Sequence, residues 1–431
     1  MSDTIFAVSS GAPPSAIAVL RVSGPSAFAA VAAIAGRAVP PRHARLRRLR
    51  DPATGETLDQ AVVLTFPGPA SATGEDIAEF HLHGGRAVVR AVEHALAMLP
   101  GCRPAEPGEF TRRALTAGRI DLTEAEGLAD LLAAETEGQR RAAIRSAEGG
   151  LRRRIEDWTD RAVGLAAMIE AAIDHSDEED AGDGDAIVAT VGRDAAALAD
   201  EIAILLAQPA VERLRDGVRV VLAGPPNSGK SSLFNAMVGR DAAIVSPISG
   251  TTRDRIEAPV VRGGIAWLLI DTAGLTDATS DPIEAIGVAR ARESVDGADL
   301  VLWLGDAPPP ERNAATILVH PRSDAEGRGA VPDGRIAASA ALSDGTSAVW
   351  VELGRRAKTL LPSGDLPALN RRQRQLCCDA QEALRVAASA TDPLIVAEEL
   401  RLARSAFDHI TGRAHLENVL DALFGRFCIG K

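Results

Sequence analysis

The sequence contains no tyrosine, and only 3% of its 431 residues are aromatic, so side chains that stack on unpaired RNA bases are scarce. Its four cysteines show no CxxC spacing, and a chain of this length buries a core without disulfides, which indicates a reducing compartment. The N-terminal MSDTIFAVSSG lacks the basic segment of an export signal, and no apolar run approaches the roughly 20 residues that cross a bilayer. We therefore expect a cytoplasmic protein outside the membrane.

An excess of positive charge is also absent. Lys+Arg number 47 against 59 Asp+Glu, a net charge of -12, so any contact with nucleic acid must be local. Seven of the acidic residues lie between Asp174 and Asp185, a run without Lys or Arg that predicts a solvated break between helices. The negative balance therefore describes this segment more than the whole surface.

The pattern along the chain changes three times, and a length of 431 residues allows about three domains. Short β-rich segments with glycine and proline turns predict an α+β domain at residues 1–118. Helical spacing follows at 119–215, strand, glycine loop and helix alternate at 216–361, and helical spacing returns at 362–431. We predict a multidomain α/β plus α protein, in which an α/β domain is inserted into a split helical domain.

Apolar stripes at helical spacing predict the core of the helical domain. The clearest consists of Leu151, Ile155, Trp158, Ala162, Leu165 and Ile169. A second contains Leu376, Ala380, Leu384 and Ala387, and a third contains Leu416, Val419, Leu420, Leu423, Phe424 and Phe427.

Residues 218–232, VRVVLAGPPNSGKSS, combine an apolar strand, a glycine loop and a helix start. Gly224 to Ser231 fits G-x-x-x-x-G-K-[ST], in which backbone N–H groups and a helix N-terminus wrap phosphates. Lys230 would meet the β and γ oxygens and assist catalysis, and Ser231 would ligate Mg²⁺. The residues expected around the phosphates here are Asn227, Ser228, Gly229, Lys230, Ser231 and Ser232.

Two further segments continue this phosphate-binding pattern. An apolar strand ends at Asp271-Thr272-Ala273-Gly274, where the carboxylate can hold Mg²⁺ through water and the glycine amide can meet a γ-phosphate. Between the glycine loop and this strand lies a polar loop at the position of a switch segment. Its expected nucleotide-binding residues are Ser246, Pro247, Ile248, Ser249, Gly250, Thr251 and Thr252. Three elements in this order predict a phosphate-sensing nucleoside triphosphatase.

The segment expected to recognise the base departs from Asn-Lys-x-Asp. Pro321-Arg322-Ser323-Asp324 follows an apolar strand, and Asp324 keeps an acceptor for guanine N1 and the exocyclic amine. Pro321 has no side-chain amide, while the Arg322 guanidinium could stack on an aromatic plane. Ser339-Ala340 resembles the loop that backs guanine. GTP is therefore preferred to ATP, but Leu275 stands where Ras-like proteins have a water-orienting Gln.

Together these motifs resemble the MnmE (TrmE) family of tRNA modification GTPases. The resemblance covers the whole chain, including Phe66-Pro-Gly-Pro, Thr73-Gly-Glu-Asp, Pro107-Gly-Glu-Phe and the terminal Cys428-Ile-Gly-Lys431. It implies a homodimer with an N-terminal folate-binding and dimerisation domain, a split helical domain and an inserted Ras-like P-loop GTPase domain. It also implies an FAD-dependent partner of the MnmG (GidA) type, with which a carboxymethylaminomethyl or aminomethyl group is added at C5 of the tRNA wobble uridine.

The same resemblance implies ion ligands for hydrolysis. K⁺, in place of an arginine finger, would be held by Asn227, Ser246, Ile248 and Thr251, and Mg²⁺ by Ser231 and Thr252. Glu284, in Glu284-Ala-Ile-Gly287, would orient the attacking water that Leu275 cannot position. A solvated carboxylate at a helix start is the other interpretation of Glu284.

A site for a 5-formyltetrahydrofolate-type one-carbon donor is implied at Arg21, Glu79, Arg119 and Lys431. Cations suit the glutamyl carboxylates of the ligand, and a carboxylate suits the donor edge of its pterin. Position 119 is usually Lys in the family, so Arg119 keeps the charge and changes the geometry. Cys428 is either a reactive thiol or a small buried residue. His81 and His83 lack a third ligand nearby and are interpreted as structural rather than metal-binding.

Two arginine clusters are candidates for local contacts with tRNA phosphates. The first contains Arg42, Arg45, Arg47, Arg48 and Arg50, and the second Arg140, Arg141, Arg145, Arg152, Arg153 and Arg154. The second lies on a helical stripe and is interpreted as a solvated face. Two functions rival the K⁺-dependent GTPase: a folate-binding scaffold whose G domain has lost guanine selectivity, and a ribosome-assembly GTPase, against which the N-terminal domain and the Cys-Ile-Gly-Lys ending argue.

Overall fold

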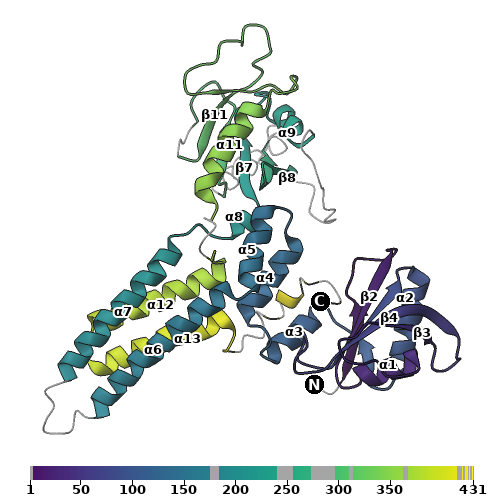
Figure 1. Cartoon of the computed structure of the whole chain (residues 1–431). Helices are drawn as coiled ribbons and strands as arrows, with labels where there is room; N and C mark the ends of the chain where they lie inside the picture. Colours follow the sequence, from purple (N-terminus) through teal and green to yellow (C-terminus); the bar gives the residue numbers. More distant parts are fainter. Residues whose placement is uncertain are drawn as a thin grey trace, which may run out of the picture. The chain divides into compact units, whose positions relative to one another are not determined.

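The computed structural model describes residues 3–174, 184–239, 256–272, 297–309, 314–362, 367–414, 420, 423–425, 427 and 430. The chain divides into two compact units (Figure 1). One consists of Met1–Ala129, Ser146–Glu156 and Asp408–Lys431, and the other of Asp130–Arg145 and Asp157–Phe407. The functional division at residues 118, 215 and 361 stays a prediction.

The first unit is built on a six-stranded mixed sheet in the order β3-β4-β5-β2-β1-β6. All neighbouring pairs are antiparallel except β1 and β6. The strands are β1 (Thr4–Val8), β2 (Ile17–Ser23), β3 (Arg45–Arg50), β4 (Thr57–Phe66), β5 (Ile77–His83) and β6 (Cys102–Pro104).

Side chains alternate across this sheet, and one face carries the main core. Leu20 and Val22 of β2 and Phe80 of β5 are buried together with residues of α1 (Ala27–Ala35) and α2 (Arg86–Ala97). On the opposite face a small core joins Ile5 and Phe110, the latter from α3 (Glu109–Thr116). The residues between the main-core positions, such as Arg21 and Glu79, therefore belong to the face that α1 and α2 do not cover.

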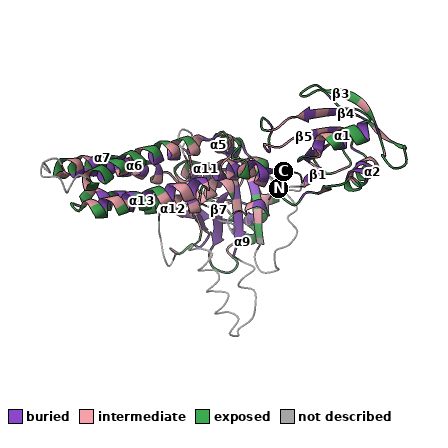
Figure 2. Ribbon diagram, turned by 90° about the horizontal axis from the view of Figure 1, so that it is seen from below, coloured by how far each residue is buried: buried purple, intermediate pink, exposed green. Residues whose placement is uncertain are grey.

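Helices α4 (Leu122–Ala133), α5 (Glu137–Ala147), α6 (Gly150–Asp174), α7 (Gly184–Leu206), α12 (Arg371–Ser389) and α13 (Pro393–Thr411) supply the helical part. The predicted stripe on α6 is confirmed, because all six of its residues, from Leu151 to Ile169, are buried. Figure 2 shows the buried residues of the long helices on their mutually facing sides. Trp158 of this stripe packs on Phe407, with ring centroids 6.0 Å apart.

The stripe on α12 is partly confirmed. Ala380, Leu384 and Ala387 are buried, whereas Leu376 is only half-buried and Cys377 beside it is fully buried. Of the third stripe, Leu416 and Val419 lie outside the described residues, and Phe424 and Phe427 are buried. Within the described helices, none is both long and apolar enough to cross a membrane.

A second six-stranded sheet, ordered β12-β11-β10-β7-β9-β8, forms the predicted α/β part. Its strands are β7 (Val218–Ala223), β8 (Ile256–Arg262), β9 (Ile265–Asp271), β10 (Leu300–Trp303), β11 (Thr316–His320) and β12 (Ile336–Ala337). Only β8 is antiparallel to its neighbour. Helices α9 (Lys230–Gly239) and α11 (Ser347–Leu360) share one core with alternate residues of β7, such as Val220 and Leu222.

Candidate functional site

The candidate phosphate site lies where β7 ends. Leu222 is in register with Asp271 of β9 on one side, and Ala223 with Trp303 of β10 on the other. Strands β9 and β10 lie on opposite sides of β7. The end of β7 is therefore the kind of switch point where open α/β sheets bind ligands.

The loop from β7 to α9 turns back on itself through left-handed backbone. Gly224 has φ 152°, Gly229 has φ 95°, and Asn227 has φ 61°, a conformation that Asn adopts more readily than most residues. A Cβ on Gly224 would lie 3.1 Å from Ser228 Oγ and 3.2 Å from the backbone N of Gly305. Gly224 and Gly229 therefore allow the left-handed turn, and Gly224 also allows the phosphate loop to approach the backbone at Gly305.

Lys230 begins α9 and is buried, with 5% of its surface exposed. Its Nζ donates hydrogen bonds to the carbonyl oxygens of Gly224 and Pro225, each at 3.0 Å, so its ammonium reaches back across the loop. Ser228 Oγ is buried and has no hydrogen-bond partner within the described chain. Ser231 and Ser232 are exposed in the first turn of α9, where hydroxyls can meet a phosphate or its metal.

Asp271 ends β9 as a buried carboxylate beside this loop. The next residue, Thr272, donates from Oγ1 to the carbonyl oxygen of Leu222 at 2.7 Å, which fastens the end of β9 to the strand that leads into the loop. The predicted site residues Ser246 to Thr252, Ala273, Gly274 and Glu284, as well as Leu275, lie outside the described residues.

The predicted base-recognition segment lies against the phosphate loop. Arg322, with φ 56°, donates from a terminal guanidinium nitrogen to the carbonyl oxygen of Asn227 at 2.8 Å. The amide of Ser323 donates to the carbonyl oxygen of Ala338 at 3.1 Å, next to buried Ser339. Asp324 and the Ser339-Ala340 segment thus belong to neighbouring loops, as the motif spacing predicts.

Sequence reasoning missed one contact of Arg322. Stacking on a base stays a prediction, and the structure adds a hydrogen bond from the guanidinium to the phosphate loop. Sequence reasoning also missed Ser339 as a loop brace, since its Oγ accepts from the amides of Ala341 and Leu342 at 3.1 and 3.2 Å. The positive φ required at position 322 is not readable from residue types, because arginine seldom adopts it.

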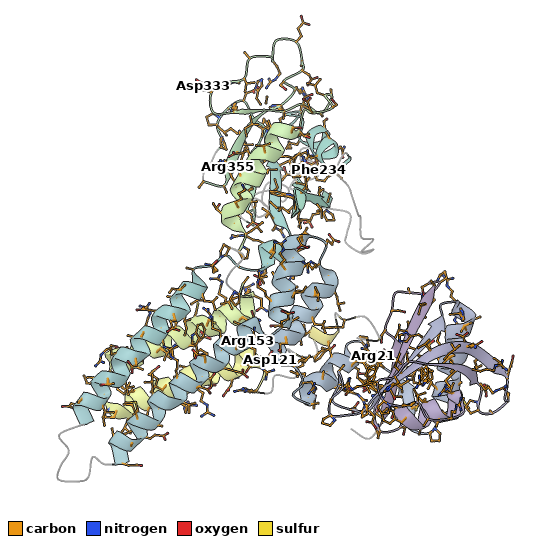
Figure 3. All side chains as sticks on the ribbon, in the orientation of Figure 1. Arg21, Asp121, Arg153, Phe234, Asp333 and Arg355 are labelled. Carbon is orange, nitrogen blue, oxygen red and sulfur yellow. The ribbon has the colours of Figure 1, made fainter. Side chains whose placement is uncertain are left out.

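In the N-terminal sheet, Arg21 and Glu79 face each other across β2 and β5. Nε and a terminal nitrogen of Arg21 donate to the same Glu79 oxygen at 3.0 and 2.9 Å, so the two predicted folate residues form an ion pair with each other (Figure 3 labels Arg21). The aliphatic part of Arg119 lies beside Gly74, with Cγ 3.4 Å from a Cβ built there. Lys431 and Cys428 lie outside the described residues.

The C-terminal segment reaches the end of β1. Ser9 Oγ donates to the carbonyl oxygen of Gly430 at 2.7 Å, and a Cβ on Gly430 would lie 2.0 Å from the carbonyl oxygen of Val8. Val8 pairs with Leu20, next to Arg21, so Gly430 lies at the end of β1, the strand beside the one that carries Arg21.

Both histidines lie near carboxylates, but within the described chain only His83 forms a hydrogen bond with one. His83 Nδ1 lies 2.7 Å from Asp59 Oδ1, and His81 Nε2 lies 3.5 Å from Glu79 Oε2. Burial opposes ionisation of Asp59, but hydrogen bonds from the amide and ring of His83 outweigh it and lower the pKa of the carboxyl. Among the described residues no three potential ligands gather around a metal position, and the structural interpretation of the two histidines stays a prediction.

A buried ion network that the sequence did not reveal braces the loop at Thr73-Gly-Glu-Asp. Arg113 of α3, 2% exposed, donates to Glu75, Glu109 and Asp3, each at 3.0 Å. Burial opposes the charge of Glu109, but hydrogen bonds from Arg103, the Glu106 amide and Arg113 outweigh it and lower the pKa of Glu109. The sequence signal that could have identified this network is that Glu75 and Glu109 belong to the motifs Thr73-Gly-Glu-Asp and Pro107-Gly-Glu-Phe.

Comparisons with known proteins identify the family of the chain. Residues 4–119 match the family model "GTP-binding protein TrmE N-terminus", and residues 122–428 match "MnmE helical domain". The chain is 53% identical to "tRNA modification GTPase MnmE" of Erythrobacter litoralis over 100% of both chains. It is 54% identical to the protein of that name from Rhizorhabdus wittichii, over 100% of this chain and 97% of the other.

Among solved structures, the G domain of the T. maritima FeoB iron transporter is 25% identical over 32% of this chain and 98% of its own, with a TM-score of 0.24, too low to add to the assignment. The full-length relatives and the two family models, by contrast, cover both the N-terminal sheet and the helical part. The chain therefore belongs to the MnmE (TrmE) family of tRNA modification GTPases.

Proposed function

We propose that this tRNA modification GTPase hydrolyses GTP in a K⁺-dependent reaction and uses it to drive modification of the tRNA wobble uridine. The observation that carries the proposal is the phosphate loop, with Lys230 bonded across it and Arg322 joining it to the base-recognition segment. As a cytoplasmic homodimer, the protein would act with an FAD-dependent partner in adding the carboxymethylaminomethyl or aminomethyl group at C5.

The described donor set suits a hard divalent cation at the phosphate site. Ser231 offers an exposed hydroxyl in the first turn of α9, and Asp271 offers a buried carboxylate at the end of β9. Asn227, exposed in the loop, would be one K⁺ ligand, with Ser246, Ile248 and Thr251 as the others. Bound Mg²⁺ and K⁺ supply positive charge beside the β,γ-bridge.

The chain's own groups would do the rest. Lys230 exchanges its bonds to loop carbonyls for phosphate oxygens, and the amides from Asn227 to Ser232 hold the phosphates in line. Glu284 orients the attacking water. Asp324 accepts from the guanine edge, and Arg322 keeps that loop against the phosphate loop.

In the N-terminal domain we propose a folate-binding site. Glu79 would accept from the pterin, Arg119 and Lys431 would meet glutamyl carboxylates, and Arg21 would be shared between Glu79 and the ligand. The contacts of Gly430 with Val8 and Ser9 support the inclusion of the neighbouring Lys431 in this proposal. Cys428 stays a candidate thiol in the same segment.

The proposal is tested by the initial rate of GTP hydrolysis at saturating GTP and Mg²⁺ as K⁺ replaces Na⁺. The wild-type rate should rise with K⁺, and Glu284→Ala and Lys230→Ala should each lower kcat about 100-fold or more. The chain holds only three lysines, and Lys358→Ala, on the exposed side of α11, is the matched control. Equal rates in K⁺ and Na⁺ would contradict the mechanism.

A second candidate is a folate-binding dimeric scaffold with a weakened, non-guanine-selective G domain. Pro321 favours it, because the position that should supply a side-chain amide to the base has none. Competition of GDP and ADP for a fluorescent nucleotide separates the candidates. Tight, Mg²⁺-dependent GDP binding with discrimination against ADP supports the GTPase, and equal affinities support the scaffold.

A further inference from the structure

Edge strand β3 of the N-terminal sheet carries a cluster of arginines without acidic residues among them. Residues 37–50 contain six arginines and no Asp or Glu, in a chain whose net charge is -12. We define the β3 arginine patch as Arg42, Arg45, Arg47, Arg48 and Arg50. Strand β3 pairs only with β4 among the described strands, so its other edge is open.

The patch differs from the second arginine cluster in how its charges are used. Glu137 pairs with both Arg140 and Arg141 at 2.7 Å, and Arg152 pairs with Glu124 and Glu156, each at 3.1 Å. Within the described chain, no residue of the β3 arginine patch has a carboxylate partner. The first cluster therefore keeps its charge available, whereas much of the second is neutralised locally.

Two of the three carboxylates on the β3–β4 hairpin are engaged elsewhere. Asp51 Oδ1 accepts from the amides of Ala53 and Thr54 at 2.7 and 3.1 Å. Asp59 accepts from the amide and ring of His83 at 2.9 and 2.7 Å. The third, Glu56, is exposed and forms no ion pair with the patch within the described chain.

Part of the patch is held in place and part is free to reach a ligand. Arg50 donates to the carbonyl oxygen of Gly55 at 2.9 Å, and the guanidinium of Arg42 lies 5.7 Å from the centre of the Phe66 ring. The side chains of Arg45 and Arg48 are exposed and make no hydrogen bond within the described chain, while their backbones pair with β4. They belong to opposite faces of the strand, since side chains alternate, so the patch presents charge around the edge.

We propose that the β3 arginine patch binds the phosphate backbone of RNA, and that the RNA is the tRNA substrate. The inference rests on the proposed function for the identity of the RNA. Guanidinium groups bind phosphate oxygens in paired hydrogen bonds and are weakly hydrated, which suits this role better than lysine would. The scarcity of aromatic residues agrees with a contact that reads the backbone and leaves the bases to another protein.

An anionic membrane or an acidic protein suits the patch less well. Leu46 is the only large apolar side chain of β3 that is exposed, at 56%, and a membrane surface or a protein interface usually needs a larger apolar anchor. Phosphate contacts need no such anchor.

The test is the affinity of the full-length protein for a fluorescently labelled tRNA transcript, measured by anisotropy across salt concentrations. Arg45→Gln/Arg48→Gln should weaken binding about tenfold at low salt and lower the slope of log K against log salt by about two. Arg140→Gln/Arg141→Gln removes the same charge from the paired cluster and should leave both quantities unchanged. Circular dichroism and thermal unfolding check that each variant is folded.

Unchanged tRNA affinity in Arg45→Gln/Arg48→Gln would overturn the inference, and so would an equal loss in both double variants, because that reports net charge alone. Aggregation of the variant at unchanged tRNA affinity would assign the arginines to protection of the sheet edge instead. Arginine-dependent binding to phosphatidylglycerol vesicles without tRNA binding would overturn it in favour of a membrane surface. K⁺-dependent hydrolysis is measured on the same wild-type preparation, so failure of the proposed function is seen separately.

Discussion

At the residue scale, Asp121 is a carboxylate whose ionised form is disfavoured by its surroundings (Figure 3 labels Asp121). Its Oδ1 accepts from the amide of Glu124 and the hydroxyl of Thr123, both at 2.8 Å, while its Oδ2 is buried without a partner in the described chain. Burial raises the pKa of Asp121 to about 6, and the neighbouring Glu124 charge adds to that rise. The Asp121 carboxyl, which caps the start of α4, therefore keeps its proton to a higher pH than an ordinary aspartate does.

We predict a pH-dependent gain in stability for Asp121→Asn, which keeps the capping oxygen and removes the charge. The folded pKa lies above the unfolded value of 3.8, so the folded protein binds more protons between about pH 4 and 6, and the free energy of unfolding falls as the pH rises through that window. The variant should gain about 2–3 kcal/mol relative to wild type between pH 4 and 7.5. Urea unfolding at both pH values measures it, and an equal difference at both would contradict the prediction.

Arg113 shows the opposite residue-scale case, a buried charge whose two terminal guanidinium nitrogens are paired with carboxylates. We predict that Arg113→Met lowers the free energy of unfolding by about 3–5 kcal/mol, because Asp3, Glu75 and Glu109 lose their shared partner. Arg355→Met is the matched control: Arg355 pairs with Glu352 on the surface of α11, and its urea midpoint should not move. Equal midpoints for the two variants would refute the bracing role.

At the scale of elements, the C-terminal segment is joined to β1 through a residue without a side chain. Gly430 has φ 99°, and the carbonyl oxygen of Val8 lies where its Cβ would be. Any other residue at position 430 must move the segment away from the strand. The terminal Cys-Ile-Gly-Lys pattern thus has a packing reason as well as a proposed binding role.

We predict that Gly430→Ala releases this segment. Carboxypeptidase should remove the last residues several times faster than from wild type, since the bond from Ser9 to the Gly430 carbonyl would be lost. Gly11→Ala is the control, because a Cβ on Gly11 meets no atom within 4 Å. Identical cleavage of both variants would show that the strand tolerates the extra carbon.

At the scale of the whole molecule, a single side chain connects α5 to the start of the α/β part. Gln139 Nε2 donates to the carbonyl oxygens of Leu214 and Arg215, each at 3.0 Å, and its Oε1 accepts from the amides of Glu135 and Thr136. Leu214 and Arg215 belong to α8 (Glu212–Arg215), which precedes β7. The start of the α/β part is therefore held by hydrogen bonds from the side-chain amide of the buried Gln139.

We predict that Gln139→Ala loosens this connection, because it leaves two carbonyls and two amides without their partner. Hydrogen exchange of residues 211–217 should become at least tenfold faster. Gln375→Ala, which removes only an exposed bond to Asp379, should leave the same amides unchanged. Exchange that is equally slow in both variants would place the anchor elsewhere.

Local patterns predicted much of the fold. The helical stripe from Leu151 to Ile169, the phosphate loop and the strand that ends at Asp271 each depend on neighbours close in sequence, so residue spacing was enough to predict them. The contact of Arg322 with Asn227 and the pairing of Arg21 with Glu79 join residues far apart, and no spacing rule reports them.

By itself, the amino-acid sequence determined the phosphate motif, the insertion of an α/β part between helices, and the family. Each depends on short runs of apolar residues and of residues, such as glycine, that set the backbone conformation. Only the tertiary structure decided which arginines remain available. Arg140 and Arg152 pair with carboxylates on the same or adjacent helices, whereas Arg45 and Arg48 lie on an open strand edge and have no carboxylate partner within the described chain. Charge is a property of the residue, but its availability depends on the partners that folding brings within reach.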